Sequence, residues 1–160
     1  MRYYVALIIS ILFGLTLELV SISNYLEPFR PHFLLMIVLF WLYSTKTQFS
    51  VGSAWLVGLL MDVALLYPLG INALTFAITA YITKRNQKWL SKLSITEISA
   101  AFAGFYILQI FLSLILNNMI GYTTGFNFWV FGSVVSSILL WPLVYTLLYE
   151  LCYILKITSK

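Results

Sequence analysis

The chain has 160 residues, of which 62% are hydrophobic and 9% are charged, with a formal net charge of +4. Soluble domains carry roughly 25% charged residues, so a water-soluble fold would leave much of this apolar surface uncovered. The composition excludes an added soluble domain and predicts a single transmembrane domain over residues 1–160.

Apolar segments recur along the chain and predict about six short transmembrane helices. Their ranges are about 3–23, 31–44, 51–67, 70–83, 95–117 and 128–149. A backbone in hydrocarbon must satisfy its own hydrogen bonds, which favours helices. The run 34–42 is continuously apolar, unlike an alternating β-barrel strand. The predicted fold class is therefore an all-α integral membrane protein.

Basic residues predict the orientation, because cytoplasmic loops collect Lys and Arg near helix ends. With both termini in the cytoplasm, every basic residue except Arg30 falls on the cytoplasmic side. These residues are Arg2, Lys46, Lys84, Arg85, Lys88, Lys92, Lys156 and Lys160. Segments 31–44 and 70–83 are short for a bilayer core of about 30 Å, so five spans plus a re-entrant hairpin is the alternative. The charge asymmetry favours six spans.

Three ionisable residues in or beside apolar segments need a physical reason, because a charge at mid-membrane costs about 2.5 to 3.5 kcal/mol on insertion scales. They are Glu18, Arg30 and Asp62, and the predicted topology places them near the same outer surface. We expect Arg30 to turn inward and form a charge-assisted pair with Asp62 or Glu18. In the alternative, Arg30 reaches the lipid headgroups and Asp62 is protonated or faces water.

The sequence gives little support for catalysis or for a bound metal. It has one histidine and one cysteine, Cys152, too few for a zinc site or an internal disulfide. No nucleophile or phosphate-binding glycine loop accompanies the buried acids. We expect no enzyme activity, no metal, no cofactor and no nucleic-acid partner.

Local patterns predict three structural features. Gly58 lies four residues before Asp62 on one helix face, where a small residue allows close packing of another helix. Ser94 stands three residues before Glu97, the pattern of a capping box at a helix start. Pro142 falls within the last predicted helix and is expected to kink it.

The segment 84–92 predicts a basic, membrane-facing loop. It carries Arg85, Lys88 and Lys92 at helical spacing, with Trp89 on another side. Anionic lipids attract such residues with about 1 kcal/mol each. Lipid anchoring explains the loop, and docking of an acidic cytosolic protein is the alternative.

Several short motifs, taken in order, resemble the MreD family. They are Phe29-Arg30-Pro31, Gly58 with Asp62, Leu69-Gly70 and Trp141-Pro142. The resemblance covers about residues 29–148 and implies signature residues at these positions. It also implies an inner-membrane, non-enzymatic scaffold of the bacterial rod complex, with a bundle like the S-components of vitamin transporters.

The resemblance also implies partners. These would be the transmembrane helix of MreC and, through it, MreB, RodA and the elongation transpeptidase, in support of lateral peptidoglycan synthesis. Membrane lipids are expected neighbours, and a homo-oligomer stays open. The alternative function is an S-component-like subunit that binds a small molecule through Glu18, Arg30 and Asp62.

Overall fold

The computed structural model describes residues 2–20, 29–44, 49–121 and 131–155, and these residues form only helices and their connections. The helices are α1 (Arg2–Leu19), α2 (Phe33–Ser44), α3 (Val51–Ala64), α4 (Ile71–Arg85), α5 (Gln87–Leu90), α6 (Ile95–Ile120) and α7 (Phe131–Ile154). The predicted all-α class is confirmed for this part of the chain.

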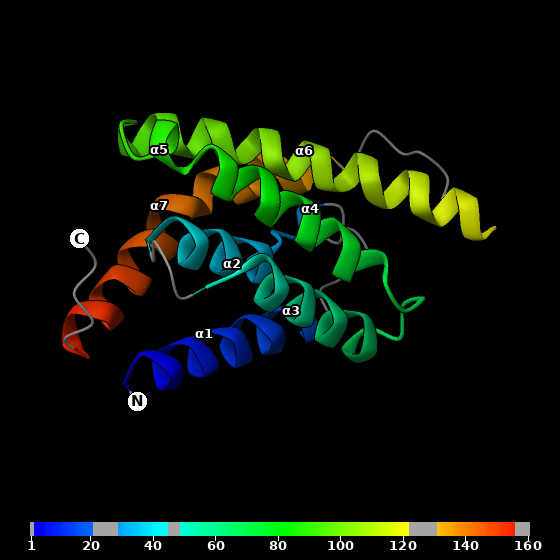
Figure 1. Cartoon of the computed structure of the whole chain (residues 1–160), viewed down its shortest axis with the longest axis horizontal. Helices are drawn as coiled ribbons and strands as arrows, with labels where there is room; N and C mark the ends of the chain where they lie inside the picture. Colours follow the sequence, from blue (N-terminus) through cyan, green and yellow to red (C-terminus); the bar gives the residue numbers. More distant parts are fainter. Residues whose placement is uncertain (1, 21–28, 45–48, 122–130, 156–160) are drawn as a thin grey trace.

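The six longer helices run alternately in opposite directions, and the start of α1 and the end of α7 lie at the same end of the bundle (Figure 1). Helix α1 lies along one side of the bundle and α6 along the other, with α2, α3 and α4 between them (Figure 1). The short α5 connects α4 to α6 at the end that holds both termini (Figure 1).

Helix α2 is the centre of the bundle. All residues from Leu34 to Leu42 are buried, and α2 packs against α1, α4 and α7. A helix that is apolar on every side is suited to full enclosure by its neighbours. The continuously apolar run recognised in the sequence is therefore the core helix of the fold.

Helix α6 begins at the predicted capping box and ends at Ile120, three residues beyond the predicted range 95–117. The backbone N–H of Ser94 donates to a Glu97 carboxylate oxygen at 2.8 Å, which completes the capping box. At the other end, Gly121 has a φ of 81°, the left-handed conformation that glycine adopts without steric cost.

Other helix ends differ from the predicted ranges. Helix α3 ends at Ala64 instead of continuing to residue 67, because Leu66 adopts a φ of 55° and turns the chain back toward α4. The predicted ends at residues 21–23 and 128–130 lie outside the described residues.

Two helices are long and apolar enough to cross a membrane, as judged by length and composition. They span Glu97–Met119 in α6 and Gly132–Ile154 in α7, and only 28% and 22% of their best windows are buried in the bundle. Shorter apolar helices are Tyr3–Leu19, Phe33–Ser44 and Val51–Ala64. Most residues of these two windows are therefore not fully buried and keep some surface that can contact lipid or another helix.

Candidate functional site

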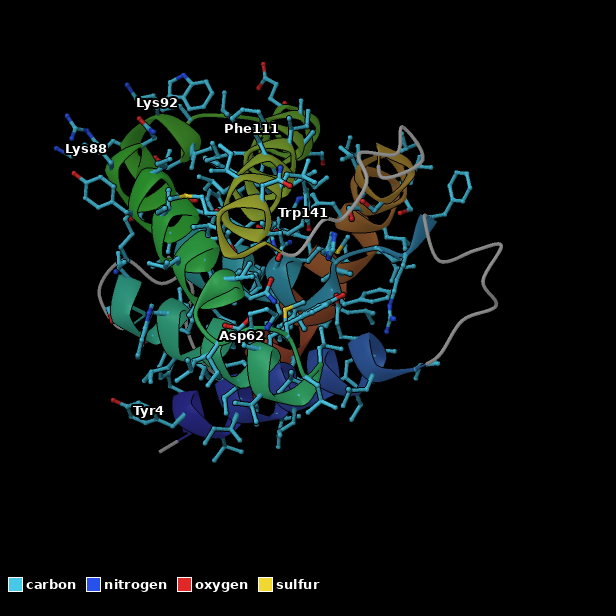
Figure 2. The ribbon with its side chains drawn as sticks, turned by 90° about the vertical axis from the view of Figure 1, so that its right-hand side faces the viewer. Tyr4, Asp62, Lys88, Lys92, Phe111 and Trp141 are labelled. Atoms are coloured by element: carbon cyan, nitrogen blue, oxygen red, sulfur yellow. The ribbon has the colours of Figure 1, made fainter. Side chains whose placement is uncertain are left out.

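Asp62 binds the start of the following helix. Its Oδ2 accepts hydrogen bonds from the N–H groups of Gly70 at 2.8 Å and Ala73 at 3.3 Å, and its Oδ1 accepts from Asn72 N–H at 3.0 Å. The first N–H groups of a helix lack partners within the helix and carry partial positive charge. The buried carboxylate therefore caps α4 and stabilises the hairpin of α3 and α4. Figure 2 shows Asp62 between these two helices.

Gly58 allows the two helices of this hairpin to approach closely. A Cβ atom on Gly58 would lie 2.5 Å from the carbonyl oxygen of Asn72 and 2.7 Å from the Cα of Ala73. Both obstacles are backbone atoms, so any larger residue would force α3 and α4 apart. The predicted close packing at Gly58 is thus found within the chain, against α4.

The turn between α3 and α4 contains Leu69 and Gly70, a second pair of residues named in the resemblance. Gly70 has a φ of 104°, which residues with side chains rarely adopt. Leu69 beside it is 69% exposed. Gly58, Asp62 and Gly70 therefore act together as one structural unit that sets the hairpin geometry.

A second group of polar side chains meets where α1 ends and α2 begins. Glu18 is buried in the bundle, and its Oε1 lies 3.4 Å from Nδ1 of His32, an ion pair when the imidazole is protonated. The ring of Tyr106 on α6 stacks on His32 with ring centres 6.3 Å apart. The backbone N–H of His32 donates to Ser137 Oγ on α7 at 3.3 Å. We call Glu18, His32, Tyr106 and Ser137, with Gln109 three residues after Tyr106 on α6, the polar cluster.

Several buried atoms of the polar cluster have no hydrogen-bond partner among the described residues. They are Glu18 Oε2, His32 Nδ1 and Gln109 Oε1, and Arg30 Nε nearby has none either, whereas the Tyr106 hydroxyl faces Ser137. Unsatisfied polar atoms in a low-dielectric interior are costly, so these atoms lower the stability of the bundle.

The predicted ion pair of Arg30 is not formed within the described part of the chain. One guanidinium nitrogen donates to the carbonyl of Leu17 at 3.3 Å. Asp62 is occupied by the α4 N-terminus, and Glu18 faces His32. The backbone donors of α4 are fixed in place by the hairpin, so they hold the Asp62 carboxylate without requiring a long side chain to be ordered.

The remaining residues named in the resemblance lie just before α2 and within α7. Phe29 is 44% exposed and Pro31 is buried at the entry to α2. Trp141 is buried in the core and packs edge-on against Phe102 with ring centres 4.3 Å apart. Pro142 lies inside α7, which continues past it to Ile154.

The basic segment lies on the surface at the end of the bundle that holds the termini. Lys88 and Lys92 are exposed and point away from the bundle (Figure 2). Trp89 is 57% exposed, and exposed Arg85 donates to the hydroxyl of Tyr81 at 3.2 Å. The segment presents charge and an aromatic ring outward, as a lipid-interface segment would.

Gln87 in α5 has a role that sequence reasoning missed. Its side-chain nitrogen donates to the carbonyls of Leu42 at 3.2 Å and Tyr43 at 3.3 Å. These carbonyls belong to the last turn of α2, where the C=O groups have no hydrogen-bond partner within the helix. The contact fixes the α4–α6 connection to the end of the core helix.

Sequence reasoning also missed His32 and Tyr106. The single histidine, His32, was considered only as a zinc ligand, for which one histidine is too few. Its position directly after Arg30 and Pro31 could have indicated a place near the predicted ionisable residues. Tyr106 resembles any other aromatic residue of an apolar helix. Within the described residues, no group of three or more His, Cys, Asp or Glu side chains could hold a metal ion.

The chain is similar to known proteins of one family. Residues 1–151 match the family model described as rod shape-determining protein MreD. The rod shape-determining protein MreD of Haemophilus influenzae is 28% identical over 123 residues, which cover 76% of this chain and 75% of that protein. No solved structure matches the chain.

Proposed function

The chain belongs to the MreD family of rod shape-determining proteins, and from this premise we propose that it is a non-enzymatic membrane scaffold of the rod complex. In this role it binds the transmembrane helix of MreC. Through MreC it associates with MreB, RodA and the elongation transpeptidase, and it supports lateral peptidoglycan synthesis.

The observation that carries this proposal is the large uncovered surface of α6 and α7. Only 28% and 22% of their apolar windows are buried, while the described connections between helices are short. A partner of such a protein is met mainly within the bilayer. Membrane helices associate through close van der Waals packing and interhelical hydrogen bonds.

The proposal includes six membrane crossings in the bacterial inner membrane, with both termini in the cytoplasm. The alternating helices and the position of Lys88 and Lys92 at the end that holds the termini support this orientation. In a Cys152→Ser background, Lys88→Cys should resist an impermeant maleimide in intact cells and react after permeabilisation. Labelling in intact cells would contradict the orientation.

Site-specific crosslinking tests the scaffold proposal. Photoreactive residues placed one at a time at Phe111 and Leu139, which are 62% and 73% exposed, should crosslink to MreC in cells. Placement at buried Phe102 is the matched control and should give no product. Absence of any MreC product from a scan of the exposed α6 and α7 positions would contradict the proposed contact.

The polar cluster favours a second candidate function, a small-molecule-binding subunit of a transporter. Its buried, unpartnered atoms are what such a site would offer a ligand. Depletion separates the two functions. Loss of rod shape supports the scaffold, whereas unchanged shape with loss of uptake of one vitamin would support the transporter subunit.

A further inference from the structure

The contact between Glu18 and His32 needs a proton. Glu18 Oε1 lies 3.4 Å from His32 Nδ1. An ionised carboxylate oxygen only accepts hydrogen bonds, and an imidazole nitrogen without a hydrogen is likewise only an acceptor. Two lone pairs face each other unless one of these atoms carries a proton. We propose that Glu18 and His32 form a pH-sensitive switch, which holds the end of α1 to the bundle when His32 is protonated and weakens when the ring loses its charge.

The burial of Glu18 makes the charge of the imidazole important. Glu18 is 4% exposed, and its Oε2 has no hydrogen-bond partner among the described residues. A neutral imidazole can donate from Nδ1, but it leaves the buried carboxylate without a counter-ion, which costs free energy. A protonated imidazole supplies both a donor and a positive charge. The contact therefore stabilises the folded chain most when His32 is protonated.

His32 connects the end of α1 to three other helices. Glu18 is the second-last residue of α1, and His32 is the residue directly before α2. The His32 ring stacks on Tyr106 of α6 with ring centres 6.3 Å apart, and its backbone N–H donates to Ser137 Oγ of α7 at 3.3 Å. A change in the Glu18–His32 contact therefore alters how the end of α1 is held against this junction.

The other described groups around His32 keep their charge state where histidine titrates. Ser137 from α7 does not titrate. Tyrosine and arginine lose a proton only at much higher pH, so Tyr106 from α6 stays neutral. Arg30, which precedes α2 and donates to the carbonyl of Leu17 at 3.3 Å, stays charged. The chain has a single histidine, so a pH change between about 5.5 and 7.5 acts mainly on His32 and its pairing with Glu18.

Protons reach the switch from the end of the bundle opposite the start of α1. The His32 side chain is 30% exposed, and α1 ends and α2 begins at this end (Figure 1). In the proposed orientation this end faces the outer side of the membrane, so the switch responds to the pH outside the cytoplasm. This location rests on the proposed function, whereas the switch itself does not.

Thermal unfolding of the purified full chain in one detergent tests the switch at about pH 5.5 and about pH 7.5. The stabilisation is present at the lower pH and is lost as the pH rises and His32 releases its proton. The melting temperature of the wild-type chain should therefore fall by about 3 to 12 °C, the shift expected for one hydrogen bond to a charged group in a chain of this length. Equal melting temperatures at the two pH values would overturn the proposal.

Matched variants assign the pH dependence to this contact. His32→Gln keeps an amide donor but does not titrate, and Glu18→Gln removes the carboxylate. Each variant should melt at the same temperature at both pH values. Glu150→Gln, at an exposed carboxylate on α7, is the control and should keep the wild-type fall. If one of the first two variants is not recovered as a folded protein, the other decides, and a pH dependence that survives in it would overturn the proposal.

Hydrogen exchange of the wild-type chain locates the change without any substitution. After correction for the intrinsic pH dependence of exchange, amides at the end of α1 should lose protection between the two pH values, and amides of the α3–α4 hairpin should not. An equal change in both regions, or no change at the end of α1, would overturn the proposal. Absence of MreC crosslinking would reject the scaffold and leave the switch in place, so the two failures are distinguishable.

Discussion

Replacement of Asp62 by asparagine tests whether this buried acid is a structural lock. The substitution keeps the shape of the side chain but supplies one acceptor oxygen instead of two. In the best rotamer the amide oxygen retains the bonds to Gly70 and Ala73, and the amide nitrogen then faces the N–H of Asn72. One buried helix-terminal donor loses its partner, and the charge at the α4 N-terminus is lost.

The expected loss follows from these contacts. A buried donor without a partner costs about 1 to 3 kcal/mol, and loss of a charge at a helix N-terminus adds up to about 1 kcal/mol. The free energy of unfolding should therefore fall by about 1 to 4 kcal/mol. On the scale for domains of this length, the melting temperature falls by roughly 2 to 16 °C.

The assay is thermal unfolding of the purified chain in one detergent, followed by intrinsic fluorescence. Glu150→Gln is the matched control, since it makes the same chemical change at an exposed position and should leave the melting temperature unchanged. Equal melting temperatures for Asp62→Asn and wild type would refute the capping role. A loss of MreC binding without any loss of stability would instead make Asp62 a partner-binding residue.

Three further substitutions test the packing described above in the same unfolding assay. Gly58→Ala should cost about 1 to 3 kcal/mol by overpacking against α4, whereas Gly104→Ala, with no atom within 4 Å of the added Cβ, should cost nothing. Gly121→Ala should cost about 1 to 2 kcal/mol because of its left-handed backbone, and a neutral result would contradict the helix end at this residue. Gln87→Ala should cost about 1 kcal/mol through the unpaired carbonyls of α2, and an unchanged melting temperature would show that α5 does not hold the core helix.

The hairpin geometry gives a structural role to three of the residues on which the resemblance to the family rests. Gly58, Asp62 and Gly70 contact or shape the same α3–α4 hairpin, so variants at these positions should lose function through instability. Arg30 and Glu18 lie at the polar cluster instead, where a substitution leaves the hairpin contacts intact and any loss of function has another cause. Measuring stability and crosslinking together on each variant separates these two causes.

The amino-acid sequence alone predicts the all-α class and the approximate positions of the helices. Continuous apolar runs predict helices in a membrane because hydrocarbon leaves the backbone no other partner, and the run from Leu34 to Leu42 is the buried core helix. Local signals also held at short range. The capping box of Ser94 and Glu97 was predicted and is present, because both of its hydrogen bonds join residues three apart.

The partners of the buried polar residues depend on tertiary packing and could not be predicted from the sequence. The expected pairing of Arg30 with an acid was chemically reasonable, yet the α4 N-terminus holds Asp62 and His32 faces Glu18. These contacts depend on how the helices pack across the bundle, and a hydropathy pattern does not predict which helix faces contact each other. His32 and Tyr106 could be identified as neighbours of Glu18 only from the packed structure.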